Sequence, residues 1–186
     1  MKVSVYYLFA IVLFPITAIL SQSGSAFVGA ETCGMCHKSE KQGEQFAIWK
    51  ASAHSKAYET LKTAEADSIA RIKGLSTKAM LSESCLKCHV SGYNVDASLK
   101  TLKFKMEDGV QCETCHGAGA DYKNLKVMKD PEEAVANGLK IFKTEEMRVA
   151  LCKECHNSES PTFDSTKSNF TEMWSKINHD IPKSGE

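Results

Sequence analysis

Eight cysteines constrain this chain more than any other feature, because all of them fall into pairs of one spacing. Each pair has the pattern Cys-x-x-Cys and is followed at once by a histidine. The four motifs are Cys33-Gly-Met-Cys36-His37, Cys85-Leu-Lys-Cys88-His89, Cys112-Glu-Thr-Cys115-His116 and Cys152-Lys-Glu-Cys155-His156. Histidine is rare elsewhere, at 6 of 186 residues in total, so four such neighbours in a row would arise by chance only about once in a million sequences.

Covalent c-type haem explains all three positions of the motif together. The two thiols add to the two vinyl groups of the porphyrin, and the adjacent histidine reaches the iron from one face. A zinc ribbon needs two cysteine pairs per metal but not the histidine, and a thioredoxin-type redox pair does not need it either. The sequence therefore predicts four covalently attached haem c groups, with disulfides or zinc sites as the alternatives.

The first 26 residues predict a secretory signal peptide. Lys2 supplies a positive start, an apolar run follows from Val3 to Leu20, and small residues lead to a cleavage position after Ala26. The alternative is a retained membrane anchor, since the apolar run is almost long enough to span a bilayer. Cleavage would leave residues 27–186 as one tetrahaem cytochrome c domain in the periplasm or outside the cell, where conditions are oxidising.

Four haems in so short a chain leave too little apolar side chain for a large protein core. We therefore expect a mainly α fold in which short helices and loops wrap around the haems, with little or no sheet. Hydrophobic periodicity predicts one long amphipathic helix over residues 38–66, and alternation predicts a strand over residues 99–107. Further short helices are expected to begin at Asp130-Pro131 and at Thr144, and to occupy residues 169–179.

Charge limits the classes of partner. Basic and acidic residues balance at 23 each, so the formal net charge is zero. This excludes a strongly basic nucleic-acid binder and provides no polybasic patch for a membrane surface. We expect redox proteins as partners, a membrane only if the leader is retained, and self-association as an open option.

The supply of iron ligands is limited. The motifs use four of the six histidines, so only His54 and His179 remain as candidate ligands for the opposite face of a haem. At most two haems can then have two histidines from this chain. The other two must use methionine, another side chain, water, no ligand, or a histidine from a second molecule. Methionine would raise the haem potential, and a missing sixth ligand would let the iron bind a small molecule.

The chain resembles the cytochrome c-554/c-prime family, which is typified by a tetrahaem electron carrier. The resemblance is carried by the first motif, by Trp-Lys-Ala-Ser-Ala-His-Ser-Lys-Ala at 49–57, by Cys-His-Val-Ser-Gly-Tyr at 88–93, by Gly-Val-Gln-Cys-Glu-Thr-Cys-His-Gly-Ala-Gly at 109–119, and by the fourth motif through to a C-terminal helix ending at His179. It implies a mostly helical fold with haems in closely stacked pairs.

The resemblance also implies that His54 and His179 are distal ligands, and we assign His179 to the haem of the first motif and His54 to that of the third. It implies a five-coordinate haem at His89. A family histidine soon after the third motif is missing here, where residues 120–128 contain none. We predict Met128 as its replacement on the His156 haem, with a buried core methionine or a neighbouring chain's histidine as alternatives.

The sequence and the resemblance together predict an exported multihaem cytochrome that transfers electrons between redox partners, a carrier rather than an enzyme, with no catalytic side chains assigned. Two alternatives remain open. One is oxidation or reduction of a small nitrogen species, or ligand binding, at an open haem. The other is a conductive filament built from copies of the chain.

Overall fold

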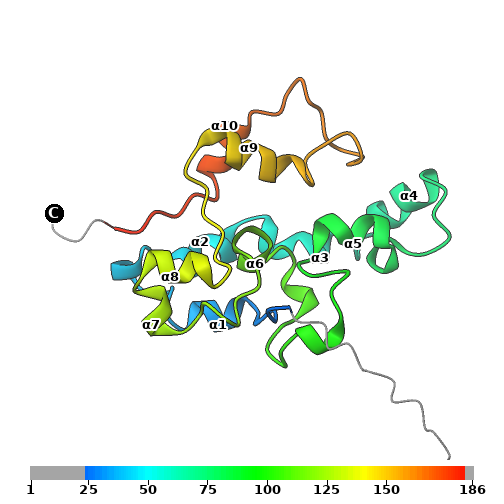
Figure 1. Cartoon of the computed structure of the whole chain (residues 1–186). Helices are drawn as coiled ribbons and strands as arrows, with labels where there is room; N and C mark the ends of the chain where they lie inside the picture. The colour runs from blue at the N-terminus through cyan, green and yellow to red at the C-terminus, as the bar shows by residue number, and fades with distance from the viewer. Residues whose placement is uncertain (1–23, 183–186) are drawn as a thin grey trace, which may run out of the picture.

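The computed structural model describes residues 24–182, and this part of the chain consists of short helices joined by loops (Figure 1). The α-helices are α1 (Ala30–Gly34), α2 (Gln45–Ala51), α3 (Ala57–Thr60), α4 (Ala64–Ile72), α5 (Glu83–His89), α6 (Cys112–His116), α7 (Leu125–Met128), α8 (Pro131–Ala136), α9 (Glu145–Lys153) and α10 (Phe170–Ser175). The 3₁₀ turns are η1 (Glu40–Gln42), η2 (His54–Lys56), η3 (Ala79–Leu81), η4 (Ala97–Leu99) and η5 (Met106–Asp108). Over residues 24–182 the β-structure amounts to an isolated bridge between Phe27 and Lys100. The mainly α fold with little or no sheet is confirmed.

The prediction of one long helix over residues 38–66 is wrong. The chain there forms η1, α2, η2 and α3, and α4 begins only at Ala64. The main interruption is Ser52, whose backbone is extended at φ −75° and ψ 164°. Its hydroxyl donates to the carbonyl of Trp49 at 2.7 Å, and such local bonds offer the backbone an alternative to the helical ladder.

The strand predicted over residues 99–107 is also wrong. Phe27 pairs with this segment through only two backbone bonds, to Leu99 and from Thr101. The chain then turns away into η5, and Leu102, whose alternation suggested a buried face, is fully exposed. Alternating polarity without a partner strand therefore produced no ladder.

Three helices begin where the sequence predicted, because each has a capping side chain. Asp130 accepts from the N–H groups of the first turn of α8. Thr144 accepts from the Met147 N–H in α9, and Asn169 accepts from the Glu172 N–H in α10. Side-chain oxygens at this position satisfy N–H groups that have no partner inside the helix. The helix expected over residues 169–179 is shorter than predicted and ends at Ser175.

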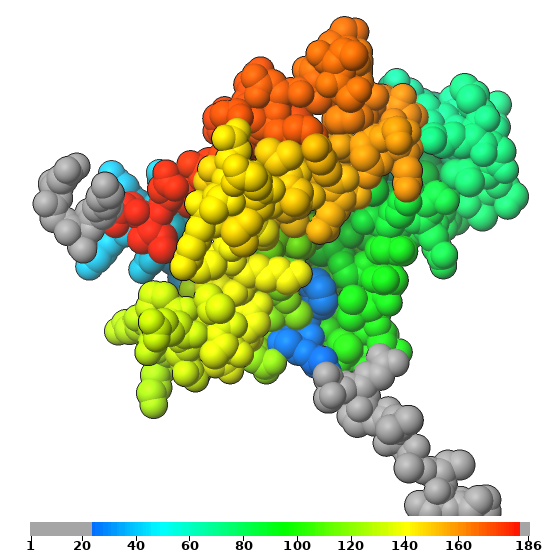
Figure 2. Space-filling view, turned by 45° about the horizontal axis from the view of Figure 1, so that its top comes forward, coloured from blue at the N-terminus to red at the C-terminus, as the bar shows by residue number. Residues whose placement is uncertain are grey.

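One arm of the molecule contains a cluster of buried apolar side chains. A cluster of buried side chains joins α3, α4, η3 and α5, which extend to the right in Figure 1. Its buried members are Tyr58, Leu61, Ala70, Ala79 and Val90. The largest fully buried side chains elsewhere include the polar Gln111 and Glu113. Figure 2 shows the orange C-terminal part of the chain lying against this arm.

The predicted leader falls mostly outside the described residues, which begin at Gly24. Its last two residues already bond to the fold: the Ser25 hydroxyl donates to the Ala118 carbonyl, and the Ala26 carbonyl accepts from the Ala120 N–H at 3.1 Å. Among residues 24–182, no helix combines the length and apolarity needed to cross a membrane.

Candidate metal centre

Short helices carry the four cysteine motifs. The second and third motifs lie wholly on α5 and α6, the first begins on α1, and the fourth begins on α9. Residues three apart lie on the same side of a helix, so one helical turn directs both thiols of a motif to the same side. None of the eight cysteines is paired in a disulfide.

Two pairs of histidine rings face one another across long stretches of sequence. The ring centroids of His54 and His156 are 6.2 Å apart, and those of His116 and His179 are 6.0 Å apart. Imidazole nitrogen binds a transition metal at about 2.0 Å, so one metal ion between two facing rings places their centroids roughly 6 Å apart. Each pair therefore has the separation that suits a single iron between them.

This pairing differs from our assignment. We predicted His179 opposite the first motif and His54 opposite the third, whereas the structure places His179 at the third motif and His54 at the fourth. The segment after α10 packs against Gly43, beside the first motif, and brings the His179 ring to His116, whose pKa is lowered by burial and by both His179 and His37.

The structure also places His54, rather than the predicted Met128, opposite His156. Met128 ends α7, which packs on α8 and lies at the far side of the molecule from α9 in Figure 1.

The η2 turn holds His54 against the segment that leads into α6. The His54 carbonyl accepts from the Val110 N–H at 2.9 Å, and the Trp49 indole donates to the Val110 carbonyl at 2.8 Å. Gly109 permits this approach, because its φ is +69° and a β-carbon there would lie 2.5 Å from the His54 carbonyl oxygen. Docking onto this segment fixes the position of the His54 backbone.

Backbone carbonyls orient three of the histidine rings. The Nδ1 atom of His89 lies 2.7 Å from the Ala57 carbonyl, that of His116 lies 3.0 Å from the Lys140 carbonyl, and that of His179 lies 2.8 Å from the Ile177 carbonyl. A carbonyl only accepts, so Nδ1 must donate and the Nε2 lone pair stays available for a metal.

Burial favours the neutral form of the paired rings. It lowers the pKa of His54, and the neighbouring His156 lowers it further. Burial likewise lowers the pKa of His156 and of His116. Since neutral imidazole is the form that binds metals, these environments suit ligands.

The first and third motifs lie side by side, because α1 packs against α6. Interaction with the Cys112 thiol lowers the pKa of Cys33, and the same contact raises that of Cys112. Two groups at this distance influence one another directly.

A buried carboxylate joins these two motifs. Glu113, inside the third motif, is 2% exposed. Its oxygens accept from the N–H groups of Val28, Gly29 and Gly119 at 2.7–2.8 Å. Gln111 adds a parallel link, accepting from the Ala30 N–H at 2.8 Å. Sequence reasoning missed both residues; the only hint was two long polar side chains flanking Cys112 in a stretch that proved to be buried.

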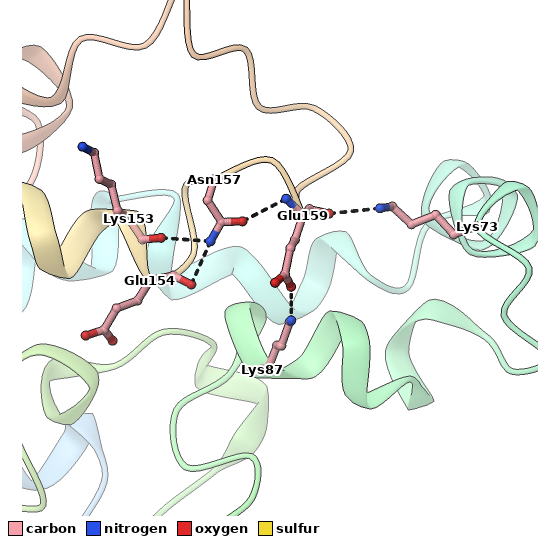
Figure 3. A network of polar contacts seen from close by, with 6 residues as sticks. All are labelled: Lys73, Lys87, Lys153, Glu154, Asn157 and Glu159. Carbon is pink, nitrogen blue, oxygen red and sulfur yellow. Dashed lines mark hydrogen bonds and ion pairs between the residues drawn. The ribbon is translucent and has the colours of Figure 1, made fainter.

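The second and fourth motifs are joined by an exposed polar network (Figure 3). Glu159 pairs with Lys87 on α5, and its carbonyl accepts from Lys73 at 3.0 Å. Asn157 fixes the loop by donating to the carbonyls of Lys153 and Glu154. These contacts hold the end of the fourth motif against α5.

The remaining cysteine contacts complete the order of the motifs. Burial, reinforced by the nearby Cys88 thiol, raises the pKa of Cys155 to about 12. Burial, reinforced by Cys152, raises the pKa of Cys115 to about 11. The motifs therefore follow one another in space in the order first, third, fourth, second.

A groove between α9 and α10, lined by Cys152 together with the aromatic rings of Phe170 and Trp174, adds apolar surface of the kind a porphyrin contacts.

Comparisons with known proteins show which family this chain resembles. A family model described as cytochrome c554 and c-prime matches residues 32–117. Cytochrome c-554 of Nitrosomonas europaea is 30% identical over 180 residues, covering 88% of this chain and 72% of that protein. No solved structure matches the chain.

Proposed function

The chain belongs to the cytochrome c-554/c-prime family of c-type cytochromes, and we propose that it is an exported carrier that holds four haems and passes electrons between redox partner proteins. The observation that supports this most directly is the spatial row of four Cys-x-x-Cys-His motifs, each in contact with the next. Electrons need closely spaced centres in order to cross a protein, and this row provides one from end to end.

Each residue of the site has a defined task in this proposal. The eight motif cysteines would hold the porphyrins through thioether bonds, and His37, His89, His116 and His156 would bind the four irons. His179 would be a second ligand at the third haem, and His54 at the fourth. The haem iron supplies one-electron chemistry when it is bound, and the protein positions the ligands and keeps the paired rings neutral.

The haem count is the first test. Holoprotein is made in a host that attaches c-type haem. One portion is converted to its pyridine haemochrome to measure the haem content, and another is weighed intact by mass spectrometry. We expect four haems per chain, and three in a Cys152→Ser/Cys155→Ser double variant. A coulometric titration should take up four electrons per chain. Fewer than four haems in the unmodified chain would overturn the proposal.

Export needs its own test. N-terminal sequencing of the protein from the periplasmic fraction should begin at Phe27 if the leader is cleaved after Ala26. An intact leader in the membrane fraction would instead establish an anchored form.

A further inference from the structure

Glu113 is a buried acidic residue with no cationic partner among residues 24–182. Its oxygens accept from the N–H groups of Val28, Gly29 and Gly119. An ionised carboxylate only accepts hydrogen bonds, so three donors match its ionised form. The ion pairs that form within this part of the chain involve other carboxylates. The negative charge is therefore held by backbone N–H groups and is not neutralised by a basic side chain.

Neighbouring groups fill the space around this carboxylate. Val28 and Gly119 are buried. A β-carbon added to Gly119 would lie 3.1 Å from the Oε1 atom of Glu113 and 2.9 Å from the Cγ2 atom of Val28, so there is no room here even for a methyl group. A charge shielded from water in this way is screened less than a surface charge, and it acts more strongly on other charges nearby.

The charge lies between the attachment cysteines of two motifs. Glu113 directly follows Cys112 in the sequence. It also accepts from the Gly29 N–H, and the carbonyl of Gly29 lies 3.8 Å from the Sγ atom of Cys33. Contact with Cys33 and burial raise the pKa of Cys112, and the Glu113 charge adds to this rise. Contact with Cys112 lowers the pKa of Cys33, while burial and the Glu113 charge oppose that lowering. Both sulfur atoms are thus within reach of the charge.

Holding the two motifs together does not by itself require a charge. Gln111, on the other side of Cys112, is as buried as Glu113 and accepts from the Ala30 N–H at 2.8 Å with a neutral amide. The second and fourth motifs are joined in a different way, through the exposed pair of Lys87 and Glu159, which carries one charge of each sign. An unbalanced buried charge therefore distinguishes the first and third motifs from the other two.

We propose that the ionised Glu113 carboxylate lowers the reduction potentials of two haems at once, those of the first and third motifs. The proposal rests on the proposed function, because it requires haem on both motifs. Reduction transfers one electron from a redox partner protein to a ferric haem and breaks no bond, so the haem becomes more negative by one charge. A fixed negative charge nearby opposes that change and favours the ferric form. The carboxylate thus shifts electrons from this half of the row towards the fourth and second haems.

The size of the effect follows from the interaction of two charges. At an effective dielectric constant of about 20, two unit charges roughly 10 Å apart change an equilibrium by about tenfold. For a one-electron couple a tenfold change corresponds to about 59 mV. Removing the charge should therefore raise each of the two potentials by about that amount.

Glu113→Gln removes the charge and keeps the size of the side chain. The holoprotein is titrated coulometrically while the haem absorption is followed. We expect the part of the curve that accounts for two electrons per chain to move to higher potential. Glu132→Gln removes an exposed charge in α8 and should titrate like the unmodified protein. An unshifted curve in Glu113→Gln would overturn the proposal, and a shift of one electron or of all four would overturn the sharing of the charge by two haems.

Glu113→Asp separates the charge from the packing. It keeps the carboxylate but is shorter by one methylene, so it cannot keep all three hydrogen bonds at their present lengths. We expect this variant to unfold at lower denaturant concentration and yet to titrate close to the unmodified protein. A shift as large as that expected for glutamine would mean that packing, not charge, sets the potentials, and would overturn the proposal even if Glu113→Gln failed to retain its haems. The haems are counted first, because fewer than four in the unmodified chain would be a failure of the proposed function instead.

Discussion

Replacing Glu113 by glutamine tests whether one buried carboxylate holds the first motif against the third. The carboxylate has two acceptor oxygens and uses both: one receives the N–H groups of Val28 and Gly119, and the other receives that of Gly29. An amide keeps the size of the side chain but has one acceptor oxygen. In the variant, the amide NH₂ would face the Gly29 N–H, so two donors would meet in a site with almost no access to water.

The size of the loss follows from these contacts. A hydrogen bond to a charged acceptor contributes about 1.5–3 kcal/mol, and a buried donor left without a partner costs about 1–3 kcal/mol. Two bonds become weaker and one is lost, so we expect Glu113→Gln to lower the free energy of unfolding by about 2–4 kcal/mol. That is a large share of the stability of a small domain, which is about 5–15 kcal/mol.

Denaturant unfolding of the holoprotein, followed by circular dichroism in the haem band, measures this loss. Glu132→Gln is the matched control, because it makes the same chemical change in the first turn of α8 at an exposed position. The control should unfold like the unmodified protein. If the two variants unfold at the same denaturant concentration, the shared carboxylate does not stabilise the α1–α6 contact and the reasoning is refuted.

Three further substitutions and one control variant probe the surroundings of the site. Gly109→Ala should cost about 1–3 kcal/mol from backbone strain and, by pushing the His54 carbonyl away, should raise the high-spin ferric signal in electron paramagnetic resonance. Gly138 also has a positive φ, +100°, but a β-carbon there would meet no atom within 4 Å, so Gly138→Ala should be strained but spectroscopically unchanged. Trp49→Phe removes one hydrogen bond and should lower the free energy of unfolding by about 1 kcal/mol in thermal or denaturant unfolding. Burial raises the pKa of Asp108, and one of its oxygens is buried without a partner among the described residues. Its ionised form is therefore disfavoured on folding, so Asp108→Asn should gain stability near pH 7. That gain should shrink as the pH falls through the raised pKa and be absent below the ordinary carboxyl pKa; unfolding measured across pH checks the sign.

Local features of this fold were predictable from the sequence. A helix cap depends on residues within three positions of one another, so Asp130 and Thr144 marked the starts of α8 and α9 correctly. Between residues 38 and 66 the sequence pattern was misleading. Helical periodicity continues across that stretch, but it contains no information on the backbone of Ser52, which is extended and ends α2.

The ligand pairing was not predictable, because it depends on contacts across the whole chain. The sequence identified His54 and His179 as the histidines left over from the motifs. Which motif each one faces depends on the docking of η2 against Val110 and on the path of the chain after α10. Glu113 shows the same limit: within its motif it occupies a variable position, and its importance appears only when Val28 and Gly29, more than 80 residues earlier, lie against it.

The shared carboxylate also imposes an order on assembly. A polypeptide leaves the ribosome from its N-terminal end, so residues 28–30 emerge long before the side chains that bind their N–H groups. Until residues 111–119 have followed, the first helix can pack against α2, but the N–H groups of Val28 and Gly29 lack their carboxylate partner. The later arrival of the third motif therefore completes the N-terminal half of the molecule, because only then do Gln111 and Glu113 bind the N–H groups of residues 28–30.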